Sequence, residues 1–167
     1  MSVSARFMLG HPARWIALGF GSGLAPKAPG TVGTLWAWVA FVVFDRWLDD
    51  AGWAWLILAA ALIGWWAVTK TAQDLGRSDP GEIVWDEVLG FWLVLWLAMP
   101  MGFVGQLVAF ALFRCFDAAK PGPVSWADGL FKHAASPALK GLGVLLDDLV
   151  AALCTLLVIA LWRSLWT

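Results

Sequence analysis

Cysteine, histidine and charged residues are all scarce in this sequence. Its 167 residues include two cysteines and two histidines, and only 14% are Asp, Glu, Lys or Arg. Cys115 and Cys154 form no close pair, so we expect buried apolar thiols rather than a disulfide framework. The formal net charge of −1 gives no indication of nucleic-acid binding. These shortages exclude small disulfide-rich proteins and basic nucleic-acid-binding proteins.

Apolar residues are abundant instead. They make up 61% of the chain, with a mean hydropathy of +0.77 and 14 tryptophans, which is typical of an integral membrane protein. The first apolar run follows a segment rich in Gly and Pro rather than a basic start, so we expect no cleavable signal peptide. The length suits one unit, and we expect residues 1–167 to form a single membrane domain.

The apolar runs predict an all-α fold. Helices are expected at residues 35–48, 53–69 and 143–162. Residues 88–113 carry no charge and are interrupted by Met99-Pro100-Met101-Gly102, which predicts a helical hairpin over 83–118. We therefore predict a polytopic helical membrane protein with about four or five helical segments.

The segment 119–140 is rich in Pro and Gly and is expected to be an irregular connection.

Lys and Arg residues predict the orientation of the chain. Nine of the eleven fall on the side that holds the N-terminus and the loops near Lys70 and Lys120, whereas Arg46 and Arg163 fall on the other. This bias places the first side in the cytoplasm.

Carboxylates are concentrated next to the apolar hairpin. Asp79, Glu82, Asp86 and Glu87 fall within nine residues, and a metal site would explain such charges at the edge of a lipid phase. The alternative is a hydrated turn whose acids stabilise the start of a helix.

The predicted hairpin places Asp86 and Glu87 at the same depth as Arg114 and Asp117. Asp147 and Asp148 form a second acidic pair, one turn inside the last helix. The acidic site is expected to face the cytoplasm.

A segment rich in Gly and Pro, residues 20–34, ends where the first long helix is expected to begin. Its backbone N–H groups, with Lys27, Thr31 and Thr34, could bind a phosphate. The alternative is an ordinary loop with Thr34 as the N-cap. The segment is not a P-loop, because no Gly-Lys-Ser/Thr occurs.

Carboxylates that hold Mg²⁺ beside basic groups are typical of phosphoryl transfer or hydrolysis, and the lipid setting suggests an amphiphilic substrate. The sequence lacks the residues that other phosphatase mechanisms use. Neither cysteine is followed six residues later by Arg, neither histidine lies in a lipid-phosphatase pattern, and no Asp-x-Asp occurs. Hydrolysis by metal-activated water is the remaining mechanism. The rival interpretation is a small cation carrier that uses the same carboxylates.

Four segments carry a resemblance to a known family. They are GSGLAPKAPGTVGT at 21–34, DPGEIVWDEVLG at 79–90, FRCFDAAKP at 113–121 and KGLGVLLDD at 140–148. In this order they resemble the phosphatidylglycerophosphatase A family. The resemblance implies a Mg²⁺-dependent enzyme of the bacterial inner membrane, facing the cytoplasm, that converts phosphatidylglycerophosphate into phosphatidylglycerol and inorganic phosphate.

The resemblance also implies roles for individual residues. Asp86, Glu87 and Asp148 are the expected catalytic residues, and Arg114 and Lys120 are expected to bind the phosphate. The expected metal ligands are Glu82, Asp86, Asp117, Asp147 and Asp148.

Overall fold

The protein is all-helical across residues 3–166, which a computed structural model describes except for the side chain of Trp166. The described part contains eight α-helices and one 3₁₀ segment, η1 (Gly19–Leu24). The α-helices are α1 (Ala5–Leu9), α2 (Pro12–Ala17), α3 (Pro29–Phe44), α4 (Asp50–Leu75), α5 (Trp85–Ala98), α6 (Phe103–Ala119), α7 (Gly122–Leu130) and α8 (Pro137–Trp166).

Helix α5 forms the centre of the fold. It packs against α3, α4, α6 and α8, so neighbouring helices cover most of its surface. Phe91 and Leu95 on this helix are fully buried, and the Trp92 indole donates a hydrogen bond to the Ala37 carbonyl of α3 at 2.9 Å. Because α5 is surrounded, the polar side chains in its first turn point into the protein.

The predicted hairpin is confirmed. Helices α5 and α6 are separated by residues 99–102, at the predicted break. The first long helix, however, begins at Pro29 rather than near Leu35. Proline suits a first turn because its missing N–H would have no partner there. Thr34 is therefore not an N-cap. It lies inside α3, and its hydroxyl donates to the Gly30 carbonyl at 2.8 Å.

Two polar segments are more helical than predicted. Helix α4 continues to Leu75, and Lys70 and Asp74 form an i,i+4 ion pair on its last turns. The segment 119–140 was expected to be irregular, which is wrong in part, because α7 occupies its middle. Pro123 stands in the first turn of α7, a position that proline tolerates.

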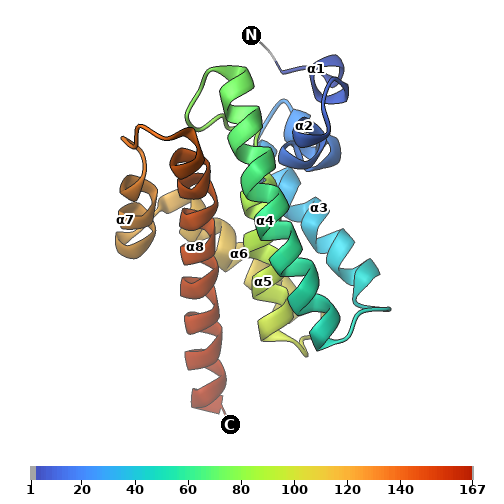
Figure 1. Cartoon of the computed structure of the whole chain (residues 1–167). Coiled ribbons are helices and arrows are strands. Elements are labelled where there is room, and N and C mark those ends of the chain that lie inside the picture. Colours follow the sequence, from blue (N-terminus) through green and yellow to red (C-terminus); the bar gives the residue numbers. More distant parts are fainter. Residues whose placement is uncertain (1–2, 167) are drawn as a thin grey trace.

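Two helices, α4 and α8, are long and apolar enough to cross a membrane, and α3 is apolar but shorter. That about four or five helical segments cross the membrane stays a prediction. Figure 1 shows α1 and α2 at the same end of the molecule as the loop between α4 and α5, with the last turns of α8 at the opposite end.

Cys115 is exposed rather than buried as expected, Cys154 is half-buried, and both are free thiols.

Candidate functional site

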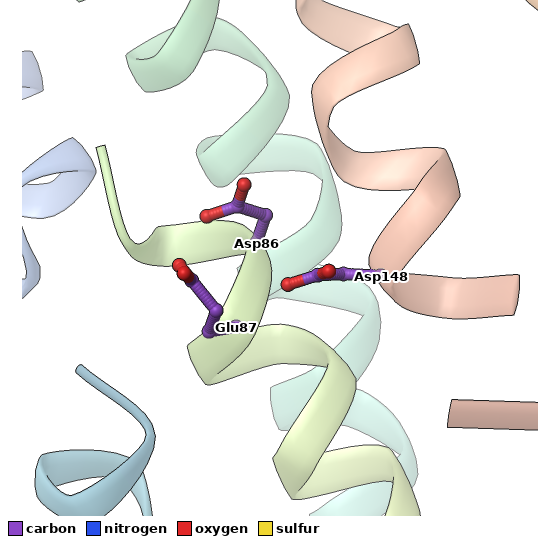
Figure 2. Close-up of side chains that lie close together, drawn as sticks. All are labelled: Asp86, Glu87 and Asp148. Atoms are coloured by element: carbon purple, nitrogen blue, oxygen red, sulfur yellow. The ribbon is translucent and has the colours of Figure 1, made fainter. Parts of the chain in front are cut away.

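Three carboxylates from two helices converge at one end of the bundle. Asp86 and Glu87 lie in the first turn of α5, and Asp148 reaches them from α8 (Figure 2). One oxygen from each carboxylate lies within 4.8 Å of the others. The backbone fixes this turn, because the Val84 N–H just before α5 donates to the Ala17 carbonyl of α2 at 2.9 Å. We call Asp86, Glu87 and Asp148 the carboxylate cluster.

The carboxylate cluster is buried and its oxygens are not fully hydrogen-bonded. Asp148 is 2% exposed, Glu87 is 9% exposed and Asp86 is half-buried, although its Oδ1 is covered. Asp86 Oδ1, Glu87 Oε2 and Asp148 Oδ2 accept no hydrogen bond from any residue that the structure describes. Three negative charges close together in a buried place are costly unless a cation neutralises them. Carboxylate oxygens are the donors that Mg²⁺ prefers, so these residues fit such an ion.

Helix α6 brings a cation and a fourth carboxylate to the cluster. Arg114 Nη1 lies 3.5 Å from Glu87 Oε1, and Arg114 also pairs with Asp117 one turn further along α6. The hairpin thus places the start of α5 beside the end of α6. Asp117 is also close enough for its charge to act on Glu87 and Asp148. Arg114 partly neutralises this acidic region.

Asp147 turns toward a different partner from that of its neighbour Asp148. Its Oδ2 accepts a hydrogen bond from Lys120 Nζ at 2.6 Å, and Lys120 also pairs with Asp128 of α7. Burial alone would favour the neutral amine, yet the hydrogen bonds to the two carboxylates raise the pKa of Lys120. The hydrogen bond from Lys120 lowers the pKa of Asp128. Lys120 therefore stays charged and ties α7 to α8.

The start of α3 faces the same site. A Cβ on Gly30 would overlap Glu87 Oε1 and lie 3.1 Å from both terminal nitrogens of Arg114, so only glycine allows this approach. The first turn of α3 offers unpaired N–H groups and the positive end of the helix dipole. Thr31 in that turn is half-buried, and Lys27 just before the helix is exposed. Thr34 uses its hydroxyl within the helix.

Glu82, an expected metal ligand, lies apart from the carboxylate cluster. It forms an ion pair with Arg77, and its side chain is 27% exposed. Asp74 pairs with Arg14 at 2.9 Å and with Lys70. Of the expected ligands, Asp86 and Asp148 lie in the cluster, while Asp117 and Asp147 are paired with cations beside it.

Two positions near the site were given no role by the sequence. Gly30 was visible only as one glycine among several in a flexible-looking segment. Lys140 lies in the segment 140–148, but nothing in the sequence related it to a small cavity that it lines beside Asp147. In both cases the missing information is a contact between distant parts of the chain.

Comparisons with known proteins find related sequences. The sequence model of the phosphatidylglycerophosphatase A family matches residues 15–163, which include the carboxylate cluster, Gly30, Arg114 and Lys120. A phosphatidylglycerophosphatase A of Escherichia coli is 36% identical over 88% of this chain and 81% of its own. The protein of the same name from Haemophilus influenzae is 35% identical over 89% and 87%.

A third relative carries a different name. A Bacteroides thetaiotaomicron protein, provisionally named a phosphatidylinositol-3-phosphatase, is 36% identical over 89% of this chain and 91% of its own. No solved structure matches the chain with significance. The family match and the relatives that share its name cover most of the sequence. The chain therefore belongs to the phosphatidylglycerophosphatase A family of phosphoric monoester hydrolases.

Proposed function

We propose that this protein hydrolyses the terminal phosphate of phosphatidylglycerophosphate, releasing phosphatidylglycerol and inorganic phosphate. Besides family membership, one observation carries the proposal. Asp86, Glu87 and Asp148 bring buried carboxylate oxygens without hydrogen bonds to within 4.8 Å of one another. A cation carrier would use the same acids, but the family match favours hydrolysis.

We further propose that Mg²⁺ is the cofactor. Asp86, Glu87 and Asp148 would hold the ion, and the nearby Asp117 and Asp147 are further candidate ligands. Glu82 would need to leave Arg77 to take part. When bound, Mg²⁺ supplies positive charge to the phosphate oxygens and favours deprotonation of water.

The protein's own groups would bind and orient the phosphate. The N–H groups in the first turn of α3 lie beside Glu87 and Arg114, so a phosphate there would meet hydrogen-bond donors and a guanidinium together. Thr31 and Lys27 are near enough in sequence to add donors. A carboxylate of the cluster would accept a proton from the attacking water, and alignment with the phosphate would favour in-line attack.

The membrane setting is part of the proposal. Helices α4 and α8 would span the bacterial inner membrane, and the shorter helices α3, α5 and α6 would complete a multi-pass bundle. The bias in Lys and Arg favours a cytoplasmic location for the carboxylate cluster. A lipid headgroup would then reach the site from the inner leaflet.

The proposed function is tested with purified protein in detergent. Inorganic phosphate should be released from phosphatidylglycerophosphate when Mg²⁺ is present. If no phosphate is released under these conditions and vesicles that contain the protein take up Mg²⁺, hydrolysis would be rejected in favour of the carrier.

Gly30→Ala is expected to lower kcat/KM by about 100-fold. The new Cβ would overlap Glu87 Oε1, so α3 or Glu87 must move, and a displacement of about 1 Å at a site can have this effect. Gly129→Ala on α7 is the matched control, because its Cβ would meet no atom within 4 Å. Equal rates for Gly30→Ala and the wild type would show that α3 does not position the phosphate.

A further inference from the structure

A small cavity lies beside Asp147, between α7, α8 and the segment that leads into α5. Its volume is about 50 Å³, and its polar lining consists of Ser78, Asp79, Asp128, Lys132, Lys140 and Asp147. A cavity of this size has room for about three or four water molecules. It is therefore suited to a phosphate-sized group and is too small for an acyl chain.

Some of the lysines around the cavity form ion pairs with carboxylates, and one does not. Lys120 bonds both Asp128 and Asp147, and Lys132 lies 3.7 Å from Asp128. Lys140 is different. Within the part of the chain that the structure describes, no carboxylate lies within ion-pair distance of its ammonium group. Asp79 also lines the cavity, but it is exposed to water, which screens its charge.

Lys140 is placed on the same helix as the acidic residues. It precedes Asp147 by two turns of α8, a separation of about 10 Å along the axis. Asp147 lines the cavity, whereas Asp148, the next residue, turns into the carboxylate cluster. The cavity is thus a neighbour of the cluster and does not share its residues.

We propose that this cavity is a second phosphate subsite, in which the Lys140 ammonium binds the anion. The inference rests on the proposed function, because that reaction provides two phosphate groups that could enter the cavity. One is the inorganic phosphate that has been released, and the other is the phosphodiester that joins the lipid to its headgroup. The two lipids named for the relatives both contain such a phosphodiester.

The test compares Lys140→Ala with the wild type in two measurements, KM for phosphatidylglycerophosphate and inhibition by inorganic phosphate. Loss of one charged contact should weaken binding about tenfold. If released phosphate occupies the cavity, the inhibition constant rises tenfold, inhibition changes from mixed to competitive, and KM stays the same. If the phosphodiester occupies it, KM rises tenfold and inhibition by phosphate is unchanged.

Two further variants serve as controls. Lys140→Arg keeps the cation and should retain most of the binding. Lys70→Ala removes a cation that pairs with Asp74 on α4 and does not line the cavity, so neither constant should change. A Lys140→Ala protein with wild-type KM and wild-type inhibition would overturn the proposal, as would a fall in kcat alone.

Failure of the proposed function would be recognised separately. If the wild type releases no phosphate from the lipid, calorimetric titration with inorganic phosphate still measures the subsite. Binding that Lys140→Ala weakens tenfold would support the subsite, and equal binding by both proteins would overturn it.

Discussion

Asp148→Asn is expected to lower phosphate release by at least about 1,000-fold while the protein stays folded. Asparagine has nearly the same shape as aspartate but lacks its charge. Asp148 is 2% exposed, and its Oδ2 is one of the buried oxygens that accept no hydrogen bond. The negative charge at this position therefore has no evident structural use, whereas a metal ligand or a proton acceptor needs it. Asp86→Asn should have the same effect.

Thermal unfolding distinguishes this result from simple misfolding. Removing one of several buried like charges should leave the melting temperature unchanged or raise it, because their repulsion decreases. Asp50→Asn is the matched control. Asp50 is exposed and lies in the first turn of α4, at the end of that helix away from the loop that leads to α5. Full activity of both Asp86→Asn and Asp148→Asn would remove the carboxylate cluster from the mechanism.

Removal of divalent cations is also expected to have a large effect. Treatment with EDTA should lower phosphate release by at least about 100-fold, because charge neutralisation by a metal contributes several kcal/mol to such reactions. Excess Mg²⁺ should restore the rate. The physical reason is that three closely spaced carboxylates would otherwise repel the negatively charged phosphate of the substrate.

A measurement without substrate makes this prediction independent of turnover. Mg²⁺ should raise the melting temperature of the wild type, because a ligand that binds only the folded state stabilises it. The shift should be much smaller for Asp148→Asn. Undiminished phosphate release after exhaustive EDTA treatment, with no shift in melting temperature, would contradict a metal at the carboxylate cluster.

The sequence predicted the central hairpin well, and the reasons are local. Residues 88–113 are uncharged and contain one break around Pro100, so two helices joined by a short turn are the simple solution. Helix ends were predicted less well. Helix α3 begins at Pro29 and α8 at Pro137, both earlier than expected, because proline in a first turn looks like a loop residue in a sequence.

The site was predicted as a group of candidates but not as a geometry. Asp147 and Asp148 are adjacent in the sequence, yet one pairs with Lys120 and the other joins Asp86 and Glu87. Neighbouring residues on a helix point about 100° apart, so only the packing of α7 and α5 around α8 could separate their roles. Glu82 is close to Asp86 in sequence but turns to Arg77 instead.

The sequence by itself determined the membrane-type composition, the all-helical fold and the family, because apolar runs and short motifs are properties of contiguous residues. The tertiary structure alone decided which acids share a buried site, that Gly30 approaches Glu87, and that Lys140 faces a cavity. These depend on contacts between helices that are distant in the chain. The direction of each side chain follows from how its helix is rotated against its neighbours, which no local pattern specifies.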